Sequence, residues 1–286
     1  MFIRKHLFRR VAIVGCGLMG TSLGLAIKKK NLAKEIIGIG RHETSLREAA
    51  DVGAIDESTM DLIKGVQGAD LIVLASPVSS IIETLETLGK HFHRSVIVTD
   101  IGSTKTAIVE RAEKGLHHSV MYVGSHPLVG SEKKGPTYAN AALYEGGACI
   151  MTPTDKTNRL AKDKIKQFWS QLGMNVRMMT PQEHDEQLAF ISHLPHFAAF
   201  AMIKALPEAC MEIVPQGLKD TTRIAASDPQ VWRDIALSNH KYVLKSIDEM
   251  VKVLASIRKS IVTKDGETLL DTLKQAKAKR ERIDKT

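Results

Sequence analysis

A glycine-rich stretch near the amino terminus has the residue types and spacing of a phosphate-binding turn. It lies between the apolar run from Val11 to Val14 and a helix-like segment from Leu23 to Lys30, and it reads Gly15-Cys16-Gly17-Leu18-Met19-Gly20. In a strand–turn–helix unit the first glycine allows a tight turn, the second lets the backbone approach a pyrophosphate, and the third lets helix and strand pack closely. Glycine turns are common, so a plain turn is the alternative. The flanking pattern on both sides favours a dinucleotide site that includes Leu18 and Met19.

The end of the next apolar run bears on which dinucleotide is bound. Sites of this kind usually place an acidic residue there, where it binds the ribose 2′-hydroxyl. Here Gly40 stands in the place of the acid, and Arg41 follows it. A missing carboxylate removes repulsion of a 2′-phosphate, and an arginine pairs well with such a group. We therefore predict NADP in preference to NAD; the alternative is that Arg41 only stacks on adenine and NAD is used.

Polar residues also follow later apolar runs, where ligands bind in open α/β sheets. We expect Ser76 and Pro77 to border the cofactor, with an ordinary loop turn as the alternative. His126 falls in a predicted loop after a strand, and a neutral imidazole suits proton abstraction near neutral pH. The other interpretation of His126 is a structural turn histidine. Ser103, taken by itself, is best interpreted as the N-cap of the helix that follows it.

The elements that must position these residues alternate between short apolar runs and helix-like segments over the first half of the chain. This alternation predicts an α/β domain with a Rossmann-type, doubly wound parallel sheet. The predicted strands are Val11–Val14, Ile36–Ile39, Leu71–Leu74, Val96–Thr99, Met121–Val123, Ala148–Met151 and Asn175–Met178, and the predicted helices are Thr21–Lys30, Ser45–Asp51, Ser79–Leu88, Lys105–Lys114 and Asp155–Leu172.

After Thr180-Pro181 the sequence shows long helical periodicity and no convincing strand. Pro181 suits the first turn of a helix with Thr180 as its cap. We therefore predict a domain boundary near Met179, with a dinucleotide-binding domain at 1–179 and an all-helical domain at 180–286.

Composition restricts the class of protein. The 286 residues are 43% hydrophobic and 25% charged, as in a soluble globular protein, and no apolar run approaches the roughly 20 residues that span a bilayer. The net charge of +8 indicates either a solvated basic surface or a field that attracts anionic ligands. Aromatic residues make up only 5%, which argues against a nucleic-acid platform. Three cysteines without metal-ligand spacing fit a reduced, cytoplasmic protein without a bound metal.

Three further motifs carry a resemblance to a known family. They are Asp100-Ile101-Gly102-Ser103-Thr104-Lys105, the stretch Gly124-Ser125-His126-Pro127-Leu128-Val129-Gly130-Ser131-Glu132, and, in the helical part, Ile191-Ser192-His193-Leu194-Pro195-His196 together with the segment from Lys219 to Pro229. With the glycine turn, these motifs resemble the prephenate/arogenate dehydrogenase family of tyrosine biosynthesis, from about Val11 to about Ile257. The chain ends soon after the helical part, so we expect neither the regulatory ACT domain nor the fused chorismate mutase domain of some family members.

The resemblance implies an oxidative decarboxylation. A hydride leaves the carbinol carbon of a cyclohexadienol for NADP or NAD, carbon dioxide is lost, and the ring becomes aromatic, which gives 4-hydroxyphenylpyruvate from prephenate or tyrosine from arogenate. The protein must then supply orientation, charge complementarity for carboxylates and a base for the hydroxyl proton. The resemblance also implies a homodimer built by the helical domain.

The resemblance assigns roles to individual residues. His126 matches the histidine that contacts the ring hydroxyl, and Ser103 matches a serine that orients this histidine. Arg223 matches a substrate-binding arginine, and its guanidinium is able to hold a carboxylate with two parallel hydrogen bonds. Further expected pocket residues are Lys219, His193, His196, Ser131 and Glu132. Without the motifs, Arg223 and Lys219 are ordinary surface charges and the two histidines are core residues; their spacing also suits a metal pair, but no third ligand is evident.

Two other functions compete with this interpretation. The glycine turn with Leu18-Met19-Gly20 also occurs in β-hydroxyacid dehydrogenases and imine reductases, which typically lack the His126 loop and use a lysine in a long middle helix. A non-catalytic NADP-binding sensor is the second alternative, and it would tolerate loss of His126 and Ser103. The sequence leaves open whether the substrate is prephenate or arogenate, because a few pocket residues discriminate between them.

Overall fold

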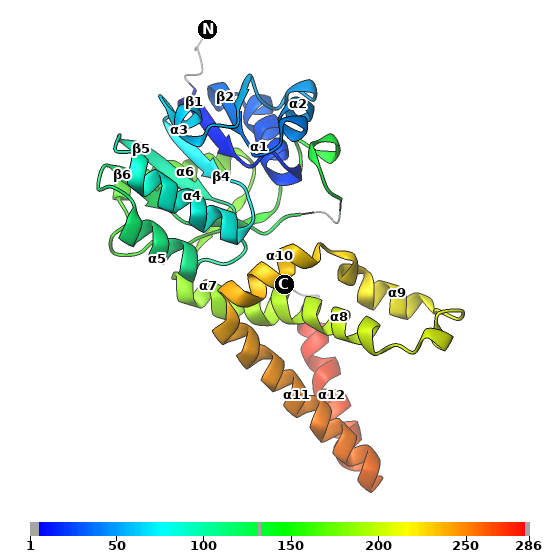
Figure 1. Ribbon diagram of the computed structural model, residues 1–286. Helices are drawn as coiled ribbons and strands as arrows, with labels where there is room; N and C mark the ends of the chain where they lie inside the picture. Colours follow the sequence, from blue (N-terminus) through cyan, green and yellow to red (C-terminus); the bar gives the residue numbers. More distant parts are fainter. Residues whose placement is uncertain (1–5, 131–132, 284–286) are drawn as a thin grey trace. The chain divides into compact units, whose positions relative to one another are not determined.

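The computed structural model describes residues 6–130 and 133–283, and these divide into two compact units that meet in sequence between His240 and Lys241. The first unit contains two β-sheets and the helices around them; the second is helical (Figure 1). The division of the chain near Met179 remains a prediction, because this separation of compact units falls at another place.

The main sheet has six parallel strands in the order β3-β2-β1-β4-β5-β6. The chain runs outward from β1 to β3, then crosses to β4 on the other side of β1, which is the doubly wound arrangement that the sequence predicts. The strands are β1 (Phe8–Val14), β2 (Ala33–Ile39), β3 (Glu57–Thr59), β4 (Leu71–Leu74), β5 (Val96–Asp100) and β6 (Val120–Val123). Strand β3 was not predicted because its three residues, Glu-Ser-Thr, carry no apolar signal.

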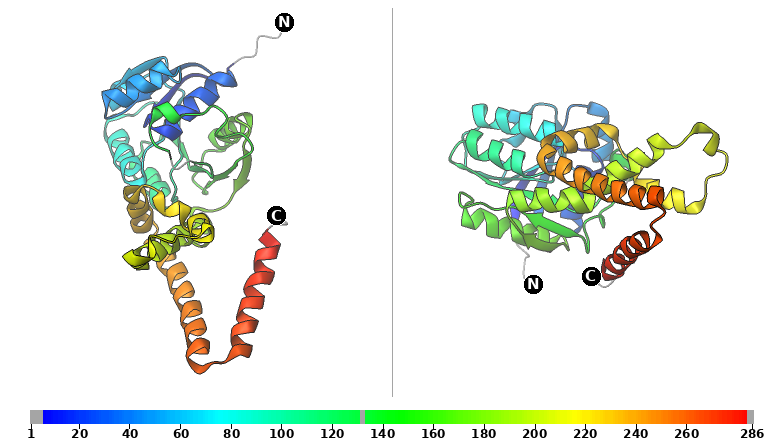
Figure 2. Two further views of the ribbon diagram at one scale, coloured as in Figure 1. Left: turned by 90° about the vertical axis from the view of Figure 1, so that its right-hand side faces the viewer. Right: turned by 90° about the horizontal axis from the view of Figure 1, so that it is seen from below.

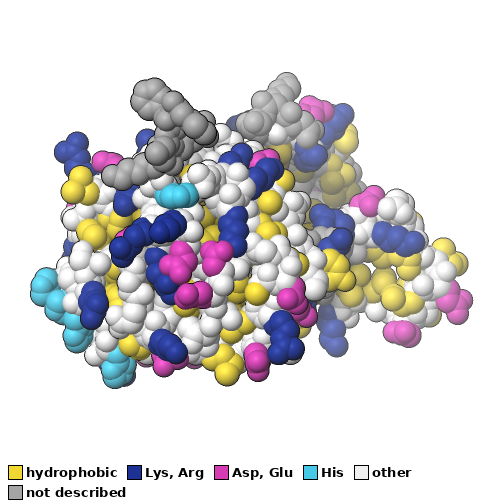
Figure 3. All heavy atoms as spheres, turned by 90° about the horizontal axis from the view of Figure 1, so that it is seen from above, with side chains coloured by type: hydrophobic (Ala, Val, Ile, Leu, Met, Phe, Trp, Pro, Cys, Tyr) yellow, Lys and Arg dark blue, Asp and Glu magenta, His cyan; other side chains and the backbone are white. Residues whose placement is uncertain are grey.

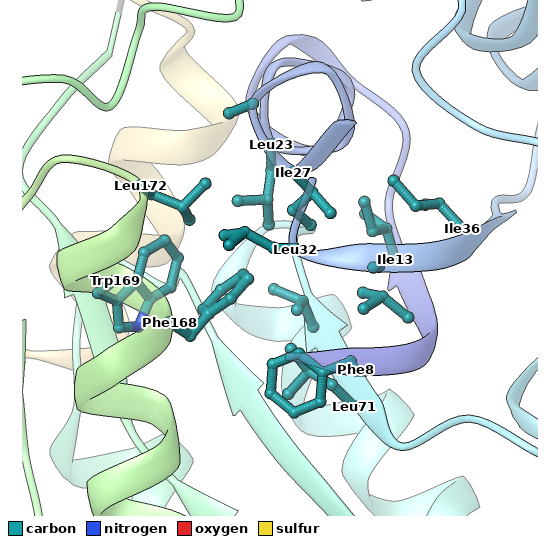
Figure 4. Close-up of a cluster of buried hydrophobic side chains, with 14 of the residues drawn as sticks. Phe8, Ile13, Leu23, Ile27, Leu32, Ile36, Leu71, Phe168, Trp169 and Leu172 are labelled. Carbon is teal, nitrogen blue, oxygen red and sulfur yellow. The ribbon is translucent and has the colours of Figure 1, made fainter. Parts of the chain in front are cut away.

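Two hydrophobic clusters cover the two faces of this sheet. Alternate residues of β1 enter different clusters, as the two-residue period of a strand requires: Val11 and Ile13 in one, Ala12 and Val14 in the other. The first cluster includes side chains of α1 and α6, among them the labelled Trp169 and Phe168 (Figure 4). The helices of this part are α1 (Leu18–Lys29), α2 (Glu43–Asp51), α3 (Leu62–Val66), α4 (Val78–His91), α5 (Thr106–Gly115) and α6 (Arg159–Gln171). Helix α6 begins later than predicted because Asn158 caps it, accepting a 3.0 Å hydrogen bond from the Ala161 amide.

Three further strands form a second, separate β-sheet. Strand β7 (Ser125–Pro127) pairs antiparallel with β8 (Ala148–Met151), which pairs parallel with β9 (Asn175–Met178). The predicted strands at 148–151 and 175–178 are therefore confirmed as strands but form a sheet of their own. The prediction that His126 lies in a loop was wrong: it is the central residue of β7, opposite Ile150.

Helical structure follows from Pro181 onward, as predicted, and no strand occurs in the described residues beyond it. Thr180 and Glu183 form a reciprocal capping box at the start of the first of these helices. The elements are α7 (Pro181–Leu188), a π-helical turn η2 (Ala189–His193), α8 (Leu194–Ala205), α9 (Gln216–Thr222), the 3₁₀ turns η3 (Glu208–Cys210) and η4 (Arg223–Ala226), and α10 (Pro229–Ser238). The continuous helical stretch Pro181–Ala205 has 25 residues, and an 18-residue window within it has a mean hydropathy of 1.3. It passes as a membrane span by length and composition only, which is weak support for a span by itself.

The second unit contains α11 (His240–Thr263), apart from its first residue, and α12 (Gly266–Ile283). Lys264 and Asp265 join the two helices (Figure 2). Lys264 takes a left-handed conformation with φ 55°, which turns the chain between the helices. Exposed apolar side chains line both helices: Leu244, Val251, Val253, Leu254, Ile261, Val262, Leu270 and Leu273.

One face of the first unit shows how its charge is distributed. Figure 3 shows basic side chains interspersed with acidic ones on this face rather than gathered into one basic surface. Arg10, for example, pairs with Glu35 at 2.7 Å and Glu57 at 2.8 Å. The positive side chains that the structure describes on this face therefore do not form a platform for a polyanion.

Two glycines of the turn give a matched stability test. A Cβ on Gly20 would lie 1.9 Å from the backbone oxygen of Gly15, whereas a Cβ on Gly17 would meet nothing within 4 Å. We expect Gly20→Ala to lower the free energy of unfolding by at least about 2 kcal/mol, because helix α1 must move away from the turn. Gly17→Ala should cost less than about 1 kcal/mol. Urea unfolding without cofactor measures both, and equal stabilities of the two variants would contradict the close packing at Gly20.

Candidate active site

The glycine turn lies at the carboxyl end of β1, beside β4, where the strand order reverses. Gly15 has a φ of +105°, and its amide donates a 2.8 Å hydrogen bond to the carbonyl of Ile39 at the end of β2. A Cβ on Gly15 would lie 2.6 Å from the backbone oxygen of Ala75, the residue after β4. Only glycine fits both demands, so the turn is held against the ends of both neighbouring strands.

The rest of the turn forms an open cradle at the amino terminus of α1. Gly17 is the N-cap of this 12-residue helix, is exposed and has free space around its Cα. Leu18 and Met19 form its first turn, and the Met19 carbonyl accepts a 2.9 Å hydrogen bond from Tyr144. The unsatisfied amides and the positive end of the helix therefore face a place into which an anionic group fits.

Buried polar atoms without partners lie beside this cradle. Ser76 Oγ, directly after Ala75, and Thr21 Oγ1 in α1 are both buried and make no hydrogen bond among the described residues. Pro77 is the exposed N-cap of α4. An orphaned hydroxyl beside an open glycine turn is what a crevice shaped for a dinucleotide would leave, so these residues fit the predicted cofactor.

Arg41 lies where the sequence predicts it, exposed in the loop after β2. Gly40, which precedes it, donates a 3.3 Å hydrogen bond to the Thr59 carbonyl at the end of β3. A Cβ on Gly40 would approach Leu46 Cδ2 to 3.2 Å, a contact that a small shift of the leucine relieves.

The backbone on the amino-terminal side of His126 is held by an unusually complete set of hydrogen bonds. The Ser125 amide donates to Asp100 at 3.2 Å, and the Ser125 carbonyl accepts from Lys105 Nζ at 2.9 Å. Its hydroxyl contacts Thr99 Oγ1 at 3.0 Å and accepts from Trp169 Nε1 at 3.1 Å. All polar atoms of Ser125 are thus used, which fixes the direction in which the next side chain leaves the strand.

Asp100 and Lys105 form a fully buried ion pair behind Ser125. The Asp100 carboxylate also accepts from the Gly102 amide at 2.8 Å and from the Tyr122 hydroxyl at 2.7 Å. Burial, the charge of Asp100 and the hydrogen bond to it raise the pKa of Tyr122, which therefore stays a neutral donor. Each charge of the pair has enough partners to compensate for its removal from water.

His126 itself is half-buried and part of a chain of hydrogen bonds. Its Nδ1 lies 2.8 Å from Nε2 of His184, whose Nδ1 lies 2.9 Å from Oδ1 of Asp185. Burial lowers the pKa of His126 well below 6.5, and the nearby charges of His184 and Lys105 lower it further. Burial also lowers the pKa of His184, although Asp185 opposes that shift. His126 is therefore a neutral imidazole near pH 7, as proton abstraction requires.

Asp185 also holds the start of helix α5. Its two carboxylate oxygens accept from the amides of Lys105 at 2.7 Å and Thr106 at 2.8 Å. These hydrogen bonds lower its pKa together with the neighbouring His184, against the effect of burial. The interpretation of Ser103 as the N-cap of this helix was wrong, because Lys105 precedes the helix and Asp185, from α7, satisfies its first amides.

Ser103 lies half-buried in the loop between β5 and α5. Among the described residues it makes no hydrogen bond to His126, whose Nδ1 is bonded to His184 instead. Its expected role in orienting His126 stays a prediction.

The expected substrate-side residues of the helical part gather around Trp232 of α10. His196, in the first turn of α8, stacks on Trp232 with ring centroids 3.6 Å apart. The ring of His193, the last residue of η2, is steeply inclined to that of Trp232, with centroids 6.2 Å apart. His193 Nδ1 also accepts from Asn239 Nδ2 at 3.2 Å, and the same amide donates to the Asp185 carbonyl at 2.8 Å. A continuous series of contacts therefore connects these histidines with His184 and His126.

Arg223 begins turn η4, which packs against α8, and its charge lowers the pKa of His196 in addition to the effect of burial. Lys219 is exposed on α9, one helical turn before Arg223. The structure thus brings Arg223 near His196. Ser131 and Glu132 lie outside the described residues.

Sequence reasoning missed His184, Asp185 and Asn239. Their partners are 58, 80 and 54 residues away in the chain. In the polar run Glu183-His184-Asp185-Glu186 the middle two side chains are inaccessible to solvent in the structure, a burial that the polar residue types do not indicate.

Comparison with known proteins gives consistent results. Residues 23–178 match the sequence model of "Prephenate dehydrogenase, nucleotide-binding domain", and residues 180–275 match "Prephenate dehydrogenase, dimerization domain". The prephenate dehydrogenase of Bacillus subtilis is 34% identical over 93% of this chain and 74% of its own. The cyclohexadienyl dehydrogenase of Zymomonas mobilis is 30% identical over 96% of this chain and 95% of its own. The solved prephenate dehydrogenase of A. aeolicus, in complex with hydroxyphenyl propionate and NAD+, is 36% identical with a TM-score of 0.89, over 96% and 98% of the two chains.

The buried His193 predicts a pH dependence of stability. Burial lowers its pKa from 6.5 to about 4. Between these values the unfolded chain binds a proton that the folded protein refuses, so the stabilisation is present above pH 6.5 and is lost as the pH falls. The contribution of this residue should drop by about 2 kcal/mol between pH 7 and pH 5. Urea unfolding of the wild type and of His193→Gln at both pH values measures it, with the glutamine as a neutral acceptor for Asn239. Parallel pH dependences of the two proteins would show that His193 is not the titrating group.

Proposed function

The chain belongs to the prephenate dehydrogenase family, and from that premise we propose that it oxidatively decarboxylates prephenate or arogenate, with transfer of a hydride to a nicotinamide dinucleotide. The observation that carries this proposal is His126, a half-buried neutral imidazole whose Nδ1 is held by His184 and whose preceding residue is tied to the carboxyl end of β5. The pairing of β5 with β4 connects this end of the sheet with the glycine turn.

The protein supplies a base and orientation for this reaction. His126 takes the proton of the ring hydroxyl while the hydrogen on the same carbon leaves as a hydride. The bond to the ring carboxylate then breaks, carbon dioxide departs, and the electron pair of that bond completes the aromatic ring. The ring oxygen, now a phenolate, takes the proton back from His126, which restores the neutral imidazole. When bound, a nicotinamide dinucleotide would supply the hydride acceptor, and Gly15, Gly17 and Gly20 with Ser76 would hold it in the crevice beside α1.

Basic groups of the helical part suit the carboxylates of such a substrate. We assign Arg223 as the anchor, with His196 beside it and Lys219 one helical turn before it. Two parallel hydrogen bonds from a guanidinium fix both the position and the orientation of a carboxylate. Ser131, Glu132 and His193 remain proposed members of the same pocket.

We propose NADP as the preferred dinucleotide. Gly40 leaves no carboxylate at the end of β2 to repel a 2′-phosphate, and Arg41 follows it in an exposed loop. The family includes at least one protein solved with NAD+, so NAD remains the alternative that the test below separates.

We also propose a cytoplasmic homodimer with the dinucleotide-binding part at 1–179 and the substrate and dimerisation part at 180–286. The exposed apolar side chains of α11 and α12 support an interface, because a second copy would cover them. The three cysteines are all free thiols, which fits a reducing compartment.

Replacing the base tests the reaction. His126→Asn keeps a polar side chain but removes the proton acceptor, so kcat should fall by about 10²- to 10⁴-fold while KM for the dienol stays within a few fold. Steady-state assays that follow nicotinamide absorbance measure both constants. Near-normal turnover in this variant would remove His126 from the chemistry, and absence of turnover by the wild type with every dienol would refute the proposed function.

Restoring an acid at the end of β2 tests the choice of cofactor. Gly40→Asp should raise KM for NADP at least about tenfold over its value in the wild type, because a carboxylate then faces the 2′-phosphate, while KM for NAD stays level or falls. Gly40→Asn is the matched control, with the same shape and no charge. Assays with prephenate or arogenate and NAD or NADP, in all four pairings, also identify the substrate. An unchanged NADP/NAD ratio in Gly40→Asp would contradict the role of Gly40 and Arg41.

A further inference from the structure

The hydrogen bonds around His126 restrict where its proton lies. Asp185 accepts two backbone amides of α5 and also contacts His184 Nδ1 at 2.9 Å. An ionised carboxylate has no proton to donate, so the hydrogen of this contact belongs to His184 Nδ1. A neutral His184 then has only a lone pair on Nε2.

The second link follows from the first. His184 Nε2 and His126 Nδ1 are 2.8 Å apart, a distance that requires one hydrogen between them. Because His184 Nε2 is the acceptor, that hydrogen belongs to His126 Nδ1. His126 is then left with its lone pair on Nε2, the opposite ring nitrogen.

We propose that Asp185, acting through His184, holds His126 in the tautomer that carries its proton on Nδ1, so that Nε2 is the nitrogen that accepts the proton of the substrate hydroxyl. This inference rests on the function proposed above only for the identity of that hydroxyl. His184 and Asp185 are positioning residues: they set which nitrogen of His126 is basic, and the charge of Asp185 stabilises the imidazolium that forms when Nε2 gains a proton.

The same contacts explain why this arrangement needs a buried pair of residues rather than a surface carboxylate. His184 and Asp185 are almost inaccessible to water, with exposures of 0% and 1%. Water therefore does not compete for Nε2 of His184. This one acceptor overcomes the preference of a free imidazole for the tautomer that carries its proton on Nε2.

Nitrogen NMR of the histidine rings tests the tautomer without any substrate. In protein labelled with ¹⁵N-histidine, at a pH where His126 is neutral, its ring should show a protonated Nδ1 and an unprotonated Nε2; His126→Asn identifies its signals. In His184→Leu, which removes the acceptor, the proton should move to Nε2. His184→Gln is the matched control, because its amide oxygen is able to accept from Nδ1 and should retain the tautomer. A wild-type His126 with its proton on Nε2, or a tautomer unchanged in His184→Leu, would overturn the proposal.

Kinetics provide an independent readout. His184→Leu should lower kcat about 10- to 100-fold, less than loss of the base itself, with KM for the dienol and the dissociation constant of the dinucleotide within about twofold of wild type. His184→Gln should recover most of kcat. Equal losses in both variants would mean that His184 only fills space.

Two further measurements keep the result clear. Circular dichroism and thermal unfolding check that both variants fold; if His184→Leu does not, Asp185→Asn is examined by NMR for mixed tautomers at His184 and His126, and a single unchanged tautomer there would overturn the proposal. If no dienol is turned over by the wild type, the proposed function fails while the NMR result still decides the tautomer.

Discussion

The buried ion pair between Asp100 and Lys105 is the constraint on which the geometry around His126 depends. Two charges with no solvent exposure are tolerable only if nearly every lone pair and N–H has a partner, and here the partners come from separate parts of the chain. Asp100 ends β5, Tyr122 belongs to β6, and both the amide and the carbonyl of Ser125 are used. A shift of the strand that carries His126 would therefore leave a buried charge uncompensated, so the polar network fixes this strand more firmly than three residues of β-pairing alone.

A second constraint joins the sheet to the helical part of the first unit. Asp185 satisfies the first amides of α5 and at the same time contacts His184, while Ser79 of α4 donates a 2.6 Å hydrogen bond to Asp234 of α10. The elements that would hold the cofactor and those that would hold the substrate are thus connected by one carboxylate that completes a helix start and by one hydrogen bond between side chains. Without the Asp185 carboxylate two amides at the start of α5 would lose their acceptor, so this contact is specific in direction as well as favourable.

The sequence predicted what local pattern determines and missed what distant contacts determine. The buried strands of the main sheet, the glycine turn and the Thr180 cap were all predictable, because apolar runs, closely spaced glycines and a threonine before a proline are signals within a few residues. Strand β7 was not, because Ser125-His126-Pro127 becomes a strand only by pairing with β8 some 24 residues later. The partners of His126 were missed for the same reason, and Ser103 lost its expected capping role to a carboxylate that folding brings from α7. Motif resemblance identified candidate residues, but not the side chains behind them.

The π-helical turn η2 between α7 and α8 separates the two ends of one long helix. A turn with one extra residue rotates everything after it by about 100° relative to an unbroken α-helix. His184 lies before this turn and His196 after it, so their angular positions around the common axis are offset by an inserted residue. Removing one residue from this turn would therefore change the direction in which His196 leaves the helix by about 100° and leave His184 in place.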